Sequence, residues 1–218
     1  MHELAPNVFI LPGFPSYLIN TYVIGDVLVD ASTKMAVSGL KRKLHNVTIN
    51  AHTLTHVHPD HQGASHALCD EFSMPLWCPA NEVEAMITGD LSQQIPQNTL
   101  TSFLNVVWTG SAHPVERALQ EGDTVADFTV IDAPGHSPGQ VAYWREKDGI
   151  LIAGDVANNV SFTTLQEGLI EPPSAFTVNA EQNRASLRKL ADLRPSLVCF
   201  GHGKPVAGKD FRAFVDSL

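Results

Sequence analysis

The chain has few basic residues and no long apolar run. Its 218 residues include 14 Lys and Arg against 23 Asp and Glu, which gives a formal net charge of −9. A protein that binds nucleic acid through phosphate contacts needs clustered positive charge, so we expect no nucleic-acid partner. No stretch reaches the roughly 18 consecutive apolar residues that a membrane span requires, so we expect no membrane partner either.

Cysteine is also scarce. Cys69, Cys78 and Cys199 are the three cysteines, and none belongs to a C-x-x-C pair. An odd number without such spacing is typical of reduced thiols rather than of a disulfide framework. The first residues, Met1 to Leu4, lack the basic start and apolar block of a secretory signal. We therefore expect a cytoplasmic protein.

The composition is that of a folded protein with a sizeable core, because 44% of the residues are hydrophobic and 17% are charged. No low-complexity segment, charge block or Gly/Ser linker divides the chain, so we expect one domain over residues 1–218. The loop over residues 156–178 is long, apolar and rich in proline. It is expected either to form a wall of a substrate pocket or to pack over the edge of the fold.

Two parts of the chain share one local pattern, in which strand-like runs are followed by an aspartate. Gly25-Asp26 and Asp148-Gly149 separate these runs and predict hairpin turns. Asp30 follows the first hairpin and Asp155 follows the second. The repetition is a weak indication of two similar halves. The predicted strands cover residues 17–24, 27–30, 140–144 and 150–153.

Helical patterns lie between and after these hairpins. One helix is expected over about residues 33–44, with Ser32 or Thr33 as its cap. A second is expected to start at His61, and a third after Asn179, which resembles a capping residue. Two sheets with helices before, between and after them predict a layered α/β sandwich.

The sharpest motif is the segment Thr55-His56-Val57-His58-Pro59-Asp60-His61. In an extended segment the side chains at positions i and i+2 point to the same side, so His56 and His58 can bind one ion together. Pro59 favours a turn that directs Asp60 and His61 to a second position. Three imidazoles and one carboxylate within six residues suit zinc or another borderline divalent metal.

Three further positions extend this set. His136 lies in a turn of Gly and Pro after a strand, Asp155 ends the apolar run Ile152-Ala153-Gly154, and His202 stands between two glycines. Because each of them follows a hydrophobic strand, the three side chains can project from the same edge of a sheet. An isolated aspartate there is more often a turn residue, but together with the other six candidates it becomes a credible ligand.

With these residues in place, the chain resembles the metallo-β-lactamase superfamily. The H-x-H-x-D-H signature is formed by His56, His58, Asp60 and His61, and His136, Asp155 and His202 follow in the family's order. The resemblance extends over essentially the whole chain. It implies a four-layer αββα sandwich with two similar ββα halves and a dinuclear metal site at one edge.

The resemblance also implies roles for single residues. Two metal ions, zinc or alternatively iron or manganese, would be bound by the seven residues. One ion would be held by His56, His58 and His136, and the other by Asp60, His61 and His202, with Asp155 bridging. Asp60 would also act as the catalytic residue that orients the bridging hydroxide and passes a proton to the leaving group. Asp30 is expected either to anchor a ligand or to serve only in a turn or helix cap.

A bridging aspartate is typical of glyoxalase II, lactonases and related esterases rather than of the β-lactamases of this family. We therefore expect a hydrolase of a small-molecule ester, thioester or lactone. Glyoxalase II has a helical carboxy-terminal extension, and because only 16 residues follow His202 here we expect no such extension. Two alternatives remain: an iron-dependent oxidoreductase similar to persulfide dioxygenases, and a non-enzymatic metal-binding protein.

Overall fold

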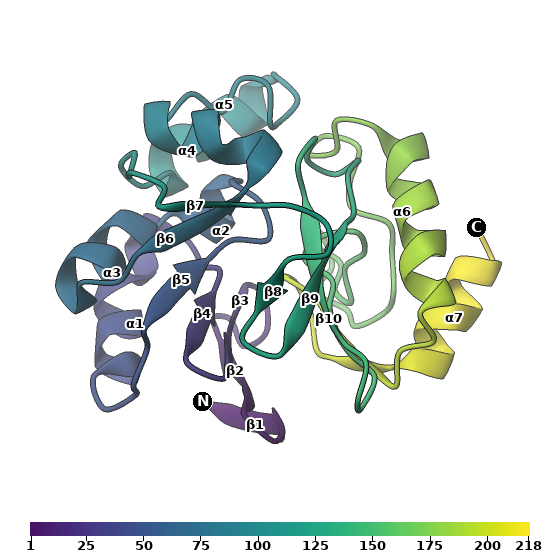
Figure 1. Cartoon of the computed structure of the whole chain (residues 1–218). Coiled ribbons are helices and arrows are strands. Elements are labelled where there is room, and N and C mark those ends of the chain that lie inside the picture. The colour runs from purple at the N-terminus through teal and green to yellow at the C-terminus, as the bar shows by residue number, and fades with distance from the viewer.

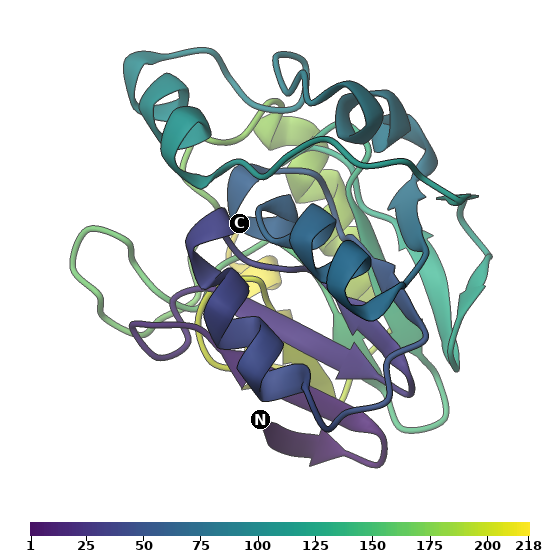
Figure 2. The same ribbon diagram turned by 90° about the vertical axis from the view of Figure 1, so that its left-hand side faces the viewer.

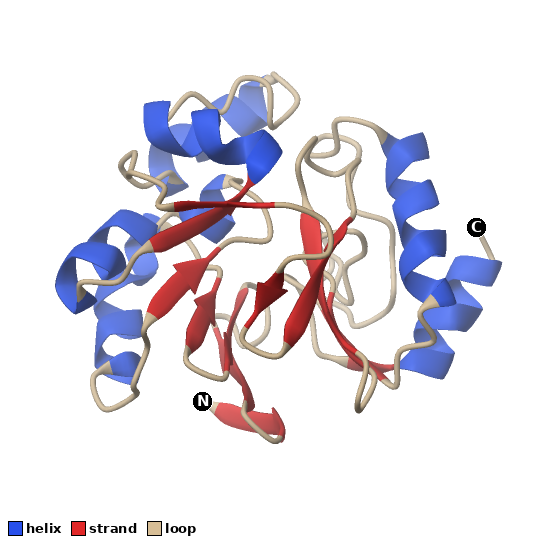
Figure 3. Ribbon diagram, viewed as in Figure 1, coloured by secondary structure: helices blue, strands red, loops and turns tan.

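The computed structural model describes all residues, 1–218, and consists of two β-sheets with helices on their outer sides (Figure 1; Figure 3). In the first sheet, strands β1 to β4 pair antiparallel and β4 to β7 pair parallel. In spatial order its strands are β1 (His2–Ala5), β2 (Val8–Pro12), β3 (Asn20–Ile24), β4 (Val27–Val29), β5 (Ala51–Thr53), β6 (Leu76–Pro79) and β7 (Arg117–Leu119).

The second sheet is antiparallel except for the parallel pair β11 and β12. In spatial order its strands are β13 (Val206–Ala207), β12 (Leu197–Cys199), β11 (Ile150–Ile152), β10 (Val141–Arg145), β9 (Phe128–Asp132) and β8 (Thr124–Val125). The helical elements are η1 (Lys34–Ala36), α1 (Val37–Leu44), α2 (Pro59–Gln62), α3 (Ser65–Phe72), η2 (Ala80–Glu82), α4 (Val83–Thr88), α5 (Thr99–Trp108), α6 (Ala180–Asp192) and α7 (Gly208–Asp216).

Helices cover the outer face of each sheet. Helices α1 and α3 lie over the first sheet, in front of it in Figure 2, and α6 and α7 lie beside the second sheet in Figure 1. Successive side chains of a strand point to opposite faces, so a strand that is covered on both sides reads as a continuous apolar run. Strand β3 shows this pattern, because Tyr22 and Ile24 join the core between the sheets and Val23 joins the core under α1 and α3.

The same alternation holds in the second sheet. Ile150 and Ile152 belong to the core between the sheets, whereas Leu151 packs in the core under α6 and α7. The expected αββα sandwich is therefore the observed architecture, and both predicted hairpins are present as β3–β4 and β10–β11. No helix is both long and apolar enough to cross a membrane.

Some local expectations were wrong. The expected first helix begins as the 3-10 turn η1, and neither Ser32 nor Thr33 caps it with a side-chain hydrogen bond. The helix expected from His61 is two helices, α2 and α3. The Asn179 cap is confirmed, because its side-chain oxygen accepts a hydrogen bond from the Gln182 N–H of α6 at 3.0 Å. The three cysteines are free and buried.

Candidate metal centre

Four candidate residues lie on the segment that leaves β5 and enters α2. His56 and His58 precede the helix. Pro59 occupies its first position, where a backbone N–H would have no partner within the helix, so the lack of one in proline costs nothing. The His61 N–H donates to the His58 carbonyl oxygen at 2.9 Å. This tight turn brings Asp60 and His61 to the end of the strand.

The other three candidates follow strands of the second sheet. His136 follows β9, Asp155 follows β11 and His202 follows β12. Strands β11 and β12 are parallel, and β9 runs in the same direction because β10 is antiparallel to both β9 and β11. The carboxyl ends of the three strands therefore lie at one edge of the sheet, as the sequence predicted.

His56, His58 and His136 form a first group of buried imidazoles. The ring centroids of His56 and His58 are 4.5 Å apart, those of His58 and His136 are 4.5 Å apart, and those of His56 and His136 are 5.1 Å apart. One ring nitrogen of each residue lies within 4.8 Å of the others, which is close enough for a shared metal ion. The first sheet thus supplies two imidazoles and the second sheet one.

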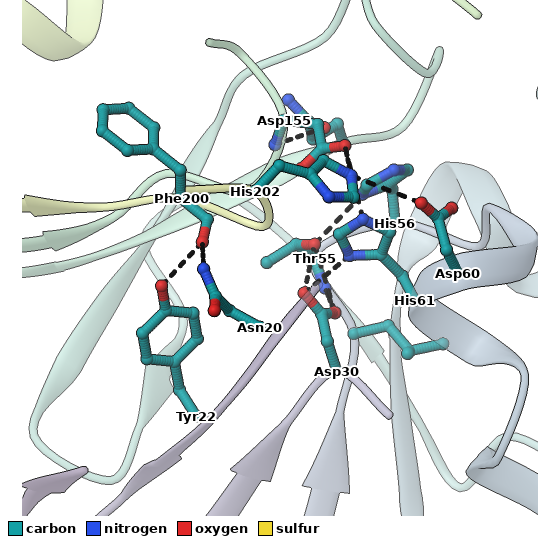
Figure 4. A network of polar contacts seen from close by, with 12 residues as sticks. Asn20, Tyr22, Asp30, Thr55, His56, Asp60, His61, Asp155, Phe200 and His202 are labelled. Atoms are coloured by element: carbon teal, nitrogen blue, oxygen red, sulfur yellow. Dashed lines mark hydrogen bonds and ion pairs between the residues drawn. The ribbon is translucent and has the colours of Figure 1, made fainter. Parts of the chain in front are cut away.

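Asp60, His61 and His202 form a second group, shown with Asp155 in Figure 4. His202 Nε2 lies 3.3 Å from Asp60 Oδ2 and 2.8 Å from Asp155 Oδ2. The same Asp155 oxygen lies 3.4 Å from His61 Nε2 and 3.7 Å from His136 Nε2. Asp155 therefore stands between the two groups and reaches residues of both.

Each of the five imidazoles has one nitrogen held by another protein group. These contacts are His56 Nδ1 to Thr55 Oγ1 (3.0 Å), His58 Nε2 to Gln94 O (2.7 Å), His61 Nδ1 to Asp30 Oδ2 (2.9 Å), His136 Nδ1 to Thr177 Oγ1 (3.3 Å) and His202 Nδ1 to Leu18 O (2.6 Å). Metal-binding histidines are oriented in this way, because a partner on one nitrogen fixes which nitrogen carries the lone pair.

Three of the five nitrogens on the inner side lack such partners, whereas His202 Nε2 faces Asp155 and Asp60. His56 Nε2, His61 Nε2 and His136 Nε2 are buried and accept or donate no hydrogen bond, and the same is true of Asp155 Oδ1. Buried polar atoms without partners are rare in proteins, and a cluster of them calls for an ion or water. The donor set of imidazoles and carboxylates therefore fits one or two divalent metal ions.

The acidic groups and the imidazoles of the centre shift one another's pKa values strongly. Burial alone would lower the pKa of His202, but the Asp155 and Asp60 carboxylates raise that pKa to about 10. Burial alone would raise the pKa of Asp60, but His202 and His61 lower it to about 2. Burial lowers the pKa of His136 to about 3, which leaves a neutral imidazole, the form that binds metal. Both carboxylates are thus ionised at neutral pH, and His202 is protonated beside them, so binding of a metal ion at His202 would release a proton.

Asp30 contacts the second group directly. Its carboxylate accepts hydrogen bonds from His61 Nδ1 at 2.9 Å, from the Thr55 N–H at 2.8 Å and from Thr55 Oγ1 at 2.9 Å. The residue has a φ of 61°, a left-handed conformation that aspartate adopts more readily than most residues. Of its two expected roles, the structure therefore shows the one in which Asp30 anchors a candidate ligand.

The remaining histidines lie away from the centre. His52 is fully buried, where its Nδ1 donates to the Leu28 carbonyl oxygen and its Nε2 lies 2.8 Å from Ser65 Oγ. His113 is also largely buried, with only 8% of it exposed. Its Nδ1 faces His66 Nδ1 at 3.0 Å.

Several residues of the centre carry no local signal in the sequence. Gln94, Thr177 and Leu18 hold ligand imidazoles from segments far along the chain, and two of the three do so through a backbone carbonyl, which any residue possesses. Glu82 also lies next to the centre, and its carboxylate accepts hydrogen bonds from the two loops that carry His56, His58 and His136. A glutamate after a strand has many ordinary uses, so only the folded chain reveals this contact.

Comparisons with known proteins agree with the fold. The family model of the metallo-beta-lactamase superfamily matches residues 16–202. The "probable metallo-hydrolase YflN" of Bacillus subtilis (strain 168) is 28% identical over 99% of this chain and 87% of its own length. A hydroxyacylglutathione hydrolase of Nitrosomonas eutropha is 31% identical over 74% of this chain, and the match spans about half (51%) of that enzyme.

Solved structures show the same architecture. The metallo-beta-lactamase family protein TTHA1429 from Thermus thermophilus has a TM-score of 0.70 at 24% identity, over 99% of this chain and 79% of that one. TTHA1623, solved in a di-iron-bound form, has a TM-score of 0.65 at 23% identity, over 94% and 93% of the two chains. The family model matches most of the chain, and the motif residues lie together at one edge of the sandwich. The chain therefore belongs to the metallo-beta-lactamase superfamily.

Proposed function

We propose that the chain is a hydrolase with two bound metal ions, zinc in the first instance, that cleaves a small ester, thioester or lactone. One ion would be held by His56, His58 and His136 and the other by Asp60, His61 and His202, with Asp155 between them. The observation that carries the proposal is the orientation of the imidazoles. Each has one nitrogen held by the protein, and buried unpartnered nitrogens of both groups surround Asp155.

Two divalent ions, when bound, supply an activated water at neutral pH and polarise the substrate oxygen. The chain's own residues determine where that chemistry occurs. Asp155 is 3% exposed and holds its carboxylate against His202 and His61. The Asp60 side chain is 17% exposed, so it is the carboxylate of the pair that can meet solvent and substrate.

Asp60 is the proposed proton-transfer residue. The carboxylate is ionised at neutral pH and would take up a proton from the attacking water once the proposed ions are bound. The proton then passes to the leaving oxygen or sulfur. His202 Nε2 lies 3.3 Å from Asp60 Oδ2, so the two groups are close enough to bind the same proposed ion.

The loop over residues 156–178 borders the same centre at both of its ends. It starts directly after Asp155, its Phe162 ring lies 4.7 Å from the His202 ring, and its Thr177 contacts His136. Apolar side chains beside a polar centre suit the acyl part of an ester or thioester. The hydroxyacylglutathione hydrolases among the relatives, whose name describes the hydrolysis of an acylated glutathione, support this substrate class.

Metal analysis coupled to a substrate panel tests the proposal. The purified chain should contain about two ions, and the panel should comprise p-nitrophenyl esters, lactones, S-lactoylglutathione, nitrocefin and a phosphodiester. We expect turnover of members of the first three classes. Turnover of nitrocefin or the phosphodiester alone would contradict the substrate class. Oxygen consumption with glutathione persulfide at a single bound iron would support an oxidoreductase instead.

The Asp60→Asn variant tests the role of the carboxylate. We expect kcat to fall by about 10²–10⁴-fold, the range typical of a lost proton-transfer residue. Asp192→Asn is the matched control, because Asp192 is an exposed residue of α6 with an ion pair to Arg212. Full turnover by Asp60→Asn with a normal metal content would refute the assigned role.

A further inference from the structure

Glu82 is a fully buried acidic residue at the end of η2 that takes no part in the proposed chemistry. Its Oε2 accepts a hydrogen bond from the Val57 N–H at 2.6 Å. Its Oε1 accepts one from the Gly139 N–H at 3.0 Å and another from the Ser137 hydroxyl. One carboxylate thus satisfies three donors from two separate loops.

Both loops carry candidate ligands of the same ion. Val57 lies between His56 and His58, on the loop that follows β5 of the first sheet. Ser137 follows His136, on the loop between β9 and β10 of the second sheet. A backbone hydrogen bond from the Val141 N–H to the Thr55 carbonyl oxygen joins the bases of these loops, and Glu82 joins them at the ligands themselves.

Glu82 packs closely against the second of these loops. A Cβ atom added to Gly139 would lie 2.5 Å from Glu82 Cγ and 2.9 Å from Asn81 Cβ, so the β9–β10 loop contacts η2 directly. The carboxylate has no Lys or Arg partner, and burial raises its pKa to about 7 despite the three hydrogen bonds. Burying such a group costs stability, so its three contacts offset only part of that cost.

We propose that Glu82 is a positioning residue, which sets the distance between the His56–His58 pair and His136 and thereby the affinity of the first metal ion. The inference rests on the proposed metal centre. A glutamine has the same length and shape but one accepting oxygen instead of two. If the amide oxygen faces Ser137 and Gly139, the NH2 group faces the Val57 N–H and that contact is lost; in the other orientation the NH2 group faces the Gly139 N–H and can donate only to the Ser137 hydroxyl.

The test measures metal affinity rather than turnover. In Glu82→Gln we expect the first ion to bind about 10–100-fold more weakly, the range found when groups that orient metal ligands are changed. Two double variants show which of the two ions is affected. With the second group disabled by His202→Ala, Glu82→Gln should weaken the remaining ion, and with the first group disabled by His136→Ala it should leave the remaining ion unchanged.

Glu84→Gln is the matched control, because Glu84 is an exposed residue two positions along the same segment. Its metal affinity should equal that of the natural chain, and the thermal midpoint of each metal-free variant shows whether folding is intact. Equal loss of both ions in Glu82→Gln, or no loss, overturns the positioning role while the two-ion hydrolase stands. Failure of the natural chain to bind two ions overturns both proposals, so the two failures are distinguishable.

Discussion

Gly201 precedes the last candidate histidine, and no other residue fits there. A Cβ atom at this position would lie 2.1 Å from Asp155 Oδ1 and 2.6 Å from His61 Cε1. We predict that Gly201→Ala displaces Asp155 and loses at least one of the two proposed metal ions, which metal quantification will show. Gly39→Ala is the control, because nothing lies within 4 Å of the added carbon in α1. Two full equivalents of metal in Gly201→Ala would contradict the prediction.

His52 predicts a pH dependence of stability. Burial lowers its pKa from 6.5 to about 4, despite the opposing hydrogen bond to the Leu28 carbonyl oxygen. The unfolded chain therefore takes up a proton near pH 6.5 and the folded chain only near pH 4. The free energy of unfolding falls as pH decreases through this window, by up to about 3 kcal/mol at roughly 1.36 kcal/mol per pKa unit.

His52→Gln should remove that part of the pH dependence. Urea unfolding of both chains, with a chelator present throughout, gives the free energy of unfolding between pH 7 and pH 4. We expect a smaller decrease in the variant, whatever its stability at pH 7. Parallel curves for the two chains would show that His52 does not titrate in this way.

For single residues, the sequence predicted which side chains meet at the candidate metal centre. It did not predict the groups that hydrogen-bond to the imidazoles and orient them. His56, His58 and Asp60 belong to one short motif, whose spacing has a direct geometric meaning. The supporting carbonyl oxygens of Leu18 and Gln94 have no such spacing, because backbone atoms are common to all residues. Their roles follow from contacts across 184 and 36 positions of the chain.

At the scale of elements, the loop over residues 156–178 is the part of the fold expected to recognise substrate. We predict that Phe162→Ala raises KM several-fold and changes kcat less, since the ring contacts His202 by an edge and no reacting atom is expected on it. Leu165→Ala is the control, because Leu165 belongs to the same loop and is 58% exposed. Kinetics with the best ester or thioester of the panel provide the measurement, and an unchanged KM would exclude this ring from the pocket.

Elements with a strong internal pattern were predictable, and short or edge elements were not. Strands β3, β4, β10 and β11 combine apolar runs with turn dipeptides, so both hairpins were found. Strands β1 and β13 lie at sheet edges and contain four and two residues, too few for a periodic signal. Helix α7 was missed, although Phe211, Phe214 and Val215 follow helical spacing. The apolar face of this helix packs against the second sheet and α6, and these contacts are seen only in the folded chain.

At the scale of the whole molecule, the proposed ions connect the two sheets. His56 and His58 follow the first sheet, and His136 and Asp155 follow the second. We predict that chelation lowers the thermal midpoint, because ions that bind only the folded chain stabilise it by mass action. At roughly 1,000 times Kd one ion contributes about 4 kcal/mol, and for a chain of this size each kcal/mol corresponds to about 2–4 °C. Identical midpoints with and without chelator, by calorimetry, would contradict a bound metal.

The layered architecture was predictable because the motif order and the paired hairpins indicate it together. The contacts between the layers were not predictable from the sequence, because they join segments that are far apart along the chain. Tyr22 shows this: its hydroxyl donates to the Phe200 carbonyl oxygen at 2.6 Å, and the Asn20 amide donates to that oxygen at 3.0 Å and to the Gly203 carbonyl oxygen at 2.7 Å. The segment before His202 is thus fixed by strand β3, near the opposite end of the sequence.

That attachment has a consequence for biosynthesis. The imidazole of His202 is oriented by Leu18, so the last ligand finds its place only after the ribosome has translated 184 residues beyond its partner. A nascent chain that has passed His61 already carries four candidate ligands, yet it can hold them only in an open, incomplete arrangement. If the proposed pair of ions binds, we therefore expect it to be complete only after translation has passed residue 202.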